Sequence, residues 1–177
     1  DEQFVALDAV EVNKRVLFTG PAGTGKTLLA LEAARRLEAK GQRVALVCFN
    51  RLLGRWLADQ ASGSGGVQFV GTIDRLLMDV LEVNHIPREA FAHLPTDALE
   101  RLTAPDCQYQ QFDALIVDEA QDVFPEDRGY RDVLDALLRG GMGGGKWCVF
   151  GDFEKQALFA GEDQVREALE WLAGDAG

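Results

Sequence analysis

The chain has 177 residues, 47% of them hydrophobic, and a formal net charge of −11. The length suits one α/β domain with a sizeable core, and the hydrophobic share excludes a disordered chain. No apolar run reaches the roughly 20 residues that span a bilayer and no basic leader opens the chain, so we expect a cytoplasmic protein without a membrane partner. The negative charge opposes binding of nucleic acid.

Short apolar segments alternate with helical patterns, which predicts a parallel sheet covered by helices on both faces. Val16–Thr19 is the first predicted strand, and a helix follows from Lys26 until Gly41 stops it. The next predicted elements are the strand Val44–Phe49, a helix from about Arg51 to Asp59, a loop at 62–66, the strand Val67–Val70 and a helix that Thr72 caps.

Residues from about 84 to 111 break this alternation, because Pro87, Pro95 and Pro105 separate short helical pieces. We interpret this stretch as a small helical insertion. The remaining predicted elements are the strand Leu115–Val117, the helix Tyr130–Arg139, a loose turn at Gly140–Gly145, the strand Trp147–Phe150 and the helix Val165–Leu172.

A glycine-rich segment lies between the first predicted strand and the first predicted helix. Its residues, Gly20, Pro21, Ala22, Gly23, Thr24, Gly25, Lys26 and Thr27, fit the pattern G-x-x-x-x-G-K-[ST] at every fixed position. Glycines let backbone N–H groups turn inward on phosphate oxygens, and the helix N-terminus adds a positive dipole end. We therefore expect these residues to bind ATP, with Lys26 on the β- and γ-phosphates and the Thr27 hydroxyl on Mg²⁺. A chance glycine-rich turn is the alternative.

Two adjacent acids, Asp118 and Glu119, end the apolar segment Ala114–Val117. Ligands of α/β proteins bind at the carboxyl ends of the strands. We expect Asp118 to hold Mg²⁺ through water, and Glu119 to orient and deprotonate the attacking water. An isolated Asp-Glu pair would be a solvated strand end, but the phosphate motif upstream favours the hydrolytic interpretation.

The pentapeptide Asp118-Glu119-Ala120-Gln121-Asp122 resembles motif II of UvrD/Rep-like superfamily-one helicases, and other segments agree in order. Gln3 resembles the glutamine that contacts adenine, and Val44–Arg51 resembles motif Ia on the nucleic-acid face. Gly71-Thr72-Ile73-Asp74 resembles the threonine motif that contacts a strand phosphate, and Phe150-Gly151-Asp152 with Gln156 resembles motif III. The resemblance covers nearly the whole chain as the first RecA-like domain of such a motor.

This resemblance implies a P-loop fold with a RecA-like parallel sheet of about five strands, in which Trp147–Phe150 lies between Val16–Thr19 and Leu115–Val117. It implies a single domain over residues 1–177 whose partners are single-stranded DNA or RNA, bound only weakly by this piece alone, and a second RecA-like domain of the same chain. The catalytic residues would be Glu119, Lys26 and Gln156, and the nucleic-acid residues Phe49, Asn50, Arg51 and Thr72.

The sequence departs from the helicase pattern in three places. Gln156 lies one residue farther from Asp152 than the usual motif III allows, and the insertion is shorter than the helical subdomain of well-known members. The second RecA-like domain is missing, and the start at Asp1 suggests a piece of a longer protein. The arginines that such a domain supplies contribute ~10³-fold or more to the rate, so this piece should bind ATP better than it hydrolyses it.

Alternatives stay open at this point. Phe49, Arg51 and Arg55 form either part of a nucleic-acid groove or a core ring beside a solvated basic helix face. The whole chain is either a helicase or translocase motor domain or an ATP-driven switch that does not track nucleic acid. A structural module that only binds ATP is a third possibility, which Glu119 argues against.

Overall fold

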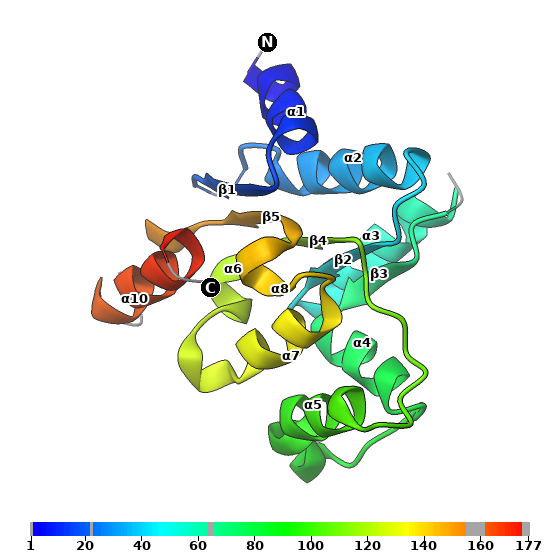
Figure 1. Cartoon of the computed structure of the whole chain (residues 1–177). Helices are drawn as coiled ribbons and strands as arrows, with labels where there is room; N and C mark the ends of the chain where they lie inside the picture. Colours follow the sequence, from blue (N-terminus) through cyan, green and yellow to red (C-terminus); the bar gives the residue numbers. More distant parts are fainter. Residues whose placement is uncertain (1, 22, 64–65, 155–161, 175–177) are drawn as a thin grey trace.

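A five-stranded parallel sheet forms the centre of the molecule (Figure 1). The computed structural model describes residues 2–21, 23–63, 66–154 and 162–174, without the side chains of residues 2–4 and 162. The strands lie in the order β1-β5-β4-β2-β3. Their bounds are β1 Arg15–Thr19, β2 Val44–Cys48, β3 Phe69–Thr72, β4 Ala114–Val117 and β5 Lys146–Gly151.

The position of β5 between β1 and β4 is the order that the resemblance implied. Phe18 of β1 lies opposite Phe150 of β5, and Val149 of β5 lies opposite Val117 of β4. The predicted α/β fold with a parallel sheet of about five strands is therefore confirmed. All strands run the same way, so the segments that follow them meet at one edge of the sheet.

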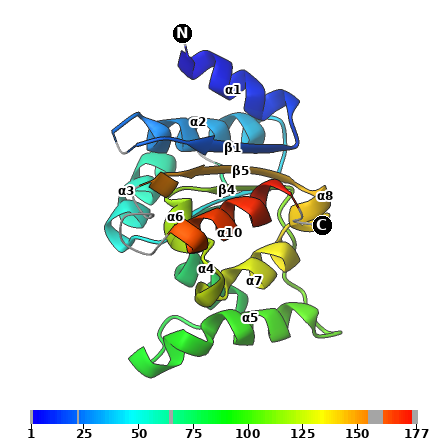
Figure 2. The ribbon, with the colours of Figure 1, turned by 90° about the vertical axis from the view of Figure 1, so that its left-hand side faces the viewer.

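Helices cover both faces of the sheet, as Figure 2 shows for α1 and α2 on one side and α5, α7 and α10 on the other. The first layer consists of α1 Glu2–Val12, α2 Lys26–Ala39 and α3 Arg51–Ser62. The second layer consists of α4 Ile73–Val80, α5 Leu94–Thr103, α6 Ala120–Val123, α7 Tyr130–Leu137, α8 Gly141–Gly144 and α10 Glu162–Ala173. Short 3₁₀ turns, η1 Arg88–His93 and η2 Glu126–Arg128, connect some of these helices.

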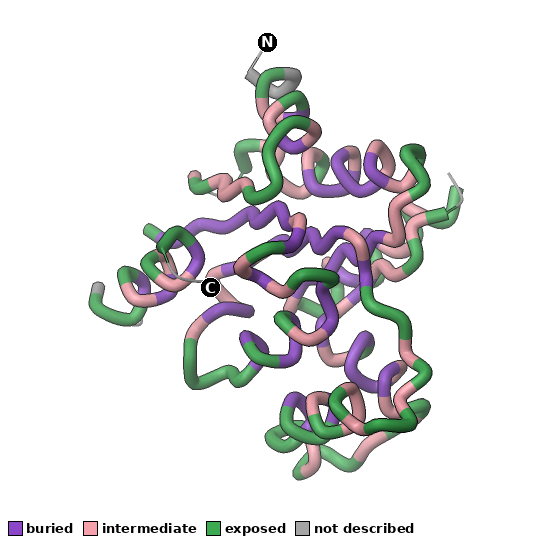
Figure 3. The backbone as a smooth tube through the Cα atoms, viewed as in Figure 1, coloured by how far each residue is buried: buried purple, intermediate pink, exposed green. Residues whose placement is uncertain are grey.

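Side chains of the central strands alternate between the two layers, and Figure 3 shows these strands buried. Val44 and Leu46 pack with the first layer, whereas Ala45 and Val47 pack with the second. Every residue of β2 and β4 is buried. A strand buried on both faces needs an unbroken apolar sequence, which is why these strands were predictable. Among the described residues, no helix is both long enough and apolar enough to cross a membrane.

Several predicted boundaries were wrong. The third strand begins at Phe69 rather than Val67 and continues to Thr72, because Gly71 and Thr72 pair with Val47 and Cys48 of β2. The turn expected at Gly140–Gly145 contains the short helix α8, whose Met142 is buried and whose Met142 carbonyl accepts a hydrogen bond from the Trp147 indole N–H. Helices α3 and α10 extend beyond their predicted ends.

Helix α1 was not predicted. Leu7 and Val10 pack into the first layer, but Val5 and Val12 are exposed. Apolar residues therefore lie on more than one side of this helix, and no apolar stripe marks it in the sequence. The segment 84–111 contains η1 and α5, in agreement with the predicted short helical pieces.

Candidate functional site

The glycine-rich loop turns between β1 and α2 at the carboxyl edge of the sheet. Gly23 and Gly25 both have φ 83°, in the left-handed region that side chains with a Cβ rarely adopt. The Gly20 N–H donates to the Gly151 carbonyl at 3.2 Å, which ties the loop to β5. Gly25 is the N-cap of α2, so the loop delivers the helix N-terminus with its free N–H groups to the same place. Ala22 lies outside the described residues.

The Lys26 ammonium lies over this loop. It donates to the carbonyls of Gly20 and Pro21 at 2.7 and 2.6 Å, and it lies 3.2 Å from the Thr24 hydroxyl oxygen. All three acceptors are neutral. Phosphate oxygens are charged acceptors and form stronger hydrogen bonds with an ammonium group, so Lys26 is positioned to exchange these partners for a phosphate.

Asp118 ends β4 beside the loop and is only 1% exposed. Its Oδ1 accepts the Glu119 N–H at 2.9 Å, but its Oδ2 has no hydrogen-bond partner among the described residues. Burial raises the pKa of Asp118, and a hydrogen bond from the Thr27 hydroxyl opposes this shift. A buried carboxylate oxygen without a partner is costly, and a cation would satisfy it.

The donor set suits Mg²⁺. Thr27 and Asp118 supply hard oxygen atoms, which this ion prefers. Within the described residues, no group of three or more His, Cys, Asp or Glu side chains could hold a metal by itself. An ion at this place would therefore take its remaining ligands from phosphate and water, as Mg²⁺ commonly does.

Glu119 follows Asp118 in a left-handed conformation, with φ 53° and ψ 43°. Its Oε2 accepts a hydrogen bond from Gln121 Nε2 at 2.5 Å, and Gln121 Oε1 accepts the Asp152 N–H at 3.0 Å. Gln121 thus links the carboxylate after β4 to the backbone after β5. A Cβ added at Gly151 would lie 2.8 Å from the Phe153 ring and 3.1 Å from Gln121 Oε1, so a larger residue there would crowd the link. Gln121 belongs to the Asp-Glu-Ala-Gln-Asp motif, but sequence reasoning gave it no role.

Besides Ala22, two further predicted residues cannot be described with their side chains. Gln156 lies outside the described residues, and only the backbone of Gln3 is described, in the first turn of α1. One turn later, Leu7 lines an apolar hollow of about 310 Å³ between α1 and α2. Leu28 and Gly25 of the loop line the same hollow, which therefore adjoins the phosphate cradle.

The four residues predicted to contact nucleic acid line one side of a hollow of about 1160 Å³ next to the ends of β2 and β3. The Asn50 side chain caps α3 by accepting the N–H groups of Leu52 and Leu53. Thr72 caps α4 as predicted, because its hydroxyl oxygen accepts the Arg75 N–H at 3.2 Å. The hydroxyl proton of Thr72 stays available to donate. Arg51 is exposed, and Arg55 does not line the hollow.

The Phe49 ring is packed against other side chains of the protein instead of being free to stack on a base. Its ring packs against the second layer, 6.5 Å from the Tyr130 ring, and the Arg128 guanidinium lies 4.6 Å from its centre. Of the two alternatives for Phe49, the packing favours the core ring.

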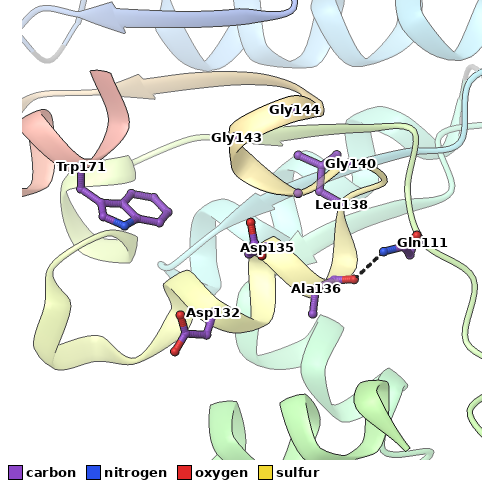
Figure 4. A pocket seen from close by; sticks show the side chains of 10 residues that line it. Gln111, Asp132, Asp135, Ala136, Leu138, Gly140, Gly143, Gly144 and Trp171 are labelled. Carbon is purple, nitrogen blue, oxygen red and sulfur yellow. Dashed lines mark hydrogen bonds between the residues drawn. The ribbon is translucent and has the colours of Figure 1, made fainter. Parts of the chain in front are cut away.

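A further hollow of about 810 Å³ lies among α7, α8 and α10 (Figure 4). Asp132 and Asp135 from α7 and Trp171 from α10 line it, together with Gln111, which donates to the Ala136 carbonyl. Gln111 and the glycines of α8 precede β4 and β5, so this hollow lies toward the amino ends of those strands. Its two carboxylates would repel phosphate, and we do not assign the nucleotide to it.

The comparison with protein families found one match, to a family described as an AAA domain, over residues 3–152. The matched range includes the glycine-rich loop, the acids after β4 and the end of β5. The comparison with curated proteins found no match.

Proposed function

The chain belongs to the AAA domain family, and from this premise we propose that it binds and hydrolyses ATP as the first RecA-like domain of a superfamily-one helicase or translocase. One observation carries the proposal. The Lys26 loop follows β1, whereas the partnerless Oδ2 of Asp118 and the carboxylate of Glu119 follow β4, and these two strands flank β5 at one edge of the sheet. Such an arrangement provides a phosphate cradle, a cation ligand and a base in one place.

Backbone N–H groups of the loop and the Lys26 ammonium would bind the β- and γ-phosphates. Thr27 and Asp118 would hold Mg²⁺, which neutralises charge on the phosphate oxygens when it is bound. Glu119 would accept the proton of the attacking water, and Gln121 would keep its carboxylate oriented. The apolar hollow between α1 and α2 supports a site for the adenine ring next to Gln3.

The motor proposal depends on the hollow that contains Phe49, Asn50, Arg51 and Thr72. It lies beside the nucleotide residues, because β2 is the neighbour of β4 and the Asp118 N–H donates to the Val47 carbonyl at 2.9 Å. A nucleic-acid strand bound there would lie close to Asp118 and Glu119 and could therefore affect hydrolysis. A second RecA-like domain would dock across the same edge and supply the missing arginines.

An ATP-driven switch without nucleic acid is the second candidate. The net charge of −11 and the internal packing of the Phe49 ring favour it. In this case ATP binding and hydrolysis would remain, but no polynucleotide would change the rate.

The test is steady-state ATPase activity at low salt, with and without single-stranded DNA or RNA. We expect stimulation by at least one polymer, reduced by Thr72→Ala. Glu119→Gln should bind Mg·ATP and lose most turnover, which separates the chemistry from contaminating activity. If neither polymer changes a rate that depends on Glu119, the switch replaces the motor. If the rate does not depend on Glu119, the hydrolytic assignment itself fails.

A further inference from the structure

We propose that the turn η1 forms the second wall of a groove for single-stranded nucleic acid, with Phe91 as the base-stacking ring and Arg88 as a phosphate contact. This inference rests on the proposed motor function and extends it to residues outside the helicase-like motifs.

The groove is the hollow of about 1160 Å³ next to β2 and β3. One wall comes from the segments that follow these strands and includes Arg51 and Thr72. The other wall comes from residues after α4 and from η1, and it includes His85, Arg88 and Phe91. These two walls are far apart in the sequence, and the chain brings them together because α4 runs from the end of β3 to the start of the insertion.

The charge of the groove is opposite to that of the whole chain. Three arginines line it, Arg51, Arg75 and Arg88, and Asp74 is its one acid among the described residues. Asp74 accepts a hydrogen bond from the Tyr130 hydroxyl at 2.6 Å, and Arg75 pairs with Asp79 at 3.2 Å. No ion pair within the described part of the chain engages Arg51 or Arg88. In a chain of net charge −11, two arginines without partners in one hollow favour a polyanion.

The groove also has an aromatic ring that the core does not use. Phe49 is held between the second layer and Arg128, whereas Phe91 is 42% exposed at the groove. The exposed ring provides a flat apolar face inside the groove, and stacking of a base on such a ring is the contact that single-strand-binding proteins use. Bases together with phosphates distinguish a nucleic acid from an acidic peptide, which would use only the arginines.

Fluorescence anisotropy of the whole chain with labelled oligo-dT and oligo-U of about 20 nucleotides tests this proposal at low salt. Phe91→Ala should weaken binding roughly 5- to 150-fold, the effect of losing one stacked base. Phe91→Leu keeps the apolar bulk without the ring and should weaken binding to a similar degree. Arg88→Ala should lower the slope of log affinity against log salt by about 0.7. The two polymers show whether the strand is DNA or RNA.

Matched controls are available elsewhere on the surface. Trp56 is 40% exposed and does not line the groove, and Arg15 is exposed at the opposite edge of the sheet. Trp56→Ala and Arg15→Ala should bind like the unaltered chain. Mg·ATP binding by every variant would show that each one is folded.

The outcomes separate the two levels of the proposal. If Thr72→Ala weakens binding but Phe91→Ala, Phe91→Leu and Arg88→Ala do not, the groove is wrong and the motor proposal stands. If the unaltered chain shows no binding to either polymer even at about 10⁻⁴ M and low salt, where the weakest non-specific contacts are still measurable, the motor proposal fails as well. If polyglutamate displaces the strand with equal affinity per charge and Phe91→Ala changes nothing, the groove is a site for an acidic protein segment, which overturns the inference.

Discussion

The Lys26 side chain contacts the same glycine-rich loop that we expect to bind phosphate. Its ammonium donates to the Gly20 and Pro21 carbonyls, and a nucleotide must offer more than these neutral acceptors. Lys26→Ala should weaken Mg·ATP binding by about 1.5–3 kcal/mol, or roughly 10- to 150-fold, because a charge-assisted contact is lost. Calorimetric titration measures this change. Lys14→Ala, an exposed lysine before β1, is the control, and equal affinity of both variants would contradict the cradle assignment.

Gln121 is a positioning residue for Glu119. It holds the carboxylate on one side and the Asp152 N–H on the other, so its loss should misorient the base without touching the phosphate cradle. We expect Gln121→Ala to lower kcat about tenfold or more with little change in KM, since partners of this kind commonly contribute 10- to 100-fold. Gln121→Glu should lower kcat further and alter its pH profile, because a second carboxylate would face Glu119. A parallel rise in KM would indicate general damage instead.

At the scale of elements, Gly54 sets the distance between α3 and β3. A Cβ added at this position would lie 2.9 Å from Thr72 Cγ2 and 3.1 Å from the Thr72 backbone nitrogen. Glycine to alanine in a helix interior ordinarily stabilises by about 1 kcal/mol. Here the contact with backbone should reverse the sign, and Gly54→Ala should destabilise the chain by about 1–3 kcal/mol.

Gly63 provides the matched control for Gly54. It ends the same helix at φ −80°, and a Cβ there would meet nothing within 4 Å. Gly63→Ala should therefore be neutral or slightly stabilising. Urea unfolding of both variants decides the matter, and a stabilised Gly54→Ala would show that α3 can move away from Thr72.

Helices α7 and α10 are joined by the ion pair of Arg131 and Glu167. Arg131 is 9% exposed, and its guanidinium donates to Glu167 at 2.6 Å and to the Phe124 carbonyl and lies 4.9 Å from the centre of the Trp171 ring. The hydrogen bond from Arg131 lowers the pKa of Glu167. The pair therefore stabilises the fold above the ordinary Glu pKa of about 4.3, and this contribution is lost as pH falls through the lowered value.

Glu167→Gln tests this ion pair. Because the Glu167 side chain is 44% exposed, the variant should lose at most about 1 kcal/mol of unfolding free energy at pH 7. The difference from the unaltered chain should shrink as pH falls below the ordinary Glu pKa and vanish once Glu167 is protonated. Thermal unfolding across this range measures it, and a difference independent of pH would mean that charge is not involved.

For the whole molecule, folding and nucleotide binding should be separable. The two core layers are apolar, and among the described residues no group of three or more His, Cys, Asp or Glu side chains could hold a metal, so EDTA should leave thermal unfolding of the chain unchanged without nucleotide. Mg·ATP at about 100 times its Kd should stabilise the fold by about 2.7 kcal/mol, and EDTA should abolish most of this gain. Scanning calorimetry measures both effects. Unfolding by EDTA alone would reveal a structural metal.

The sequence predicted those features of the protein that depend on a short continuous stretch of residues. Strands β2 and β4 are unbroken apolar runs because both of their faces are buried, and the loop from Gly20 to Thr27 needs its glycines at fixed positions. The acids after β4 could be assigned to the carboxyl edge because all strands of such a sheet run the same way. The position of β5 in the sheet came from the resemblance and is confirmed.

Other features depend on which distant segments meet, and the sequence carries no local signal for these contacts. Pairing with β2 sets the start of β3, and the hydrogen bond with the Asp152 N–H gives Gln121 its role. Contacts with Tyr130 and Arg128 determine that the Phe49 ring is packed against the protein instead of being free. Phe91 and Arg88 belong to the segment 84–111, which no motif marks, and only the packing of the chain brings them to the groove of Thr72. Local patterns determine which residues can do chemistry, whereas tertiary contacts decide which of them share a site.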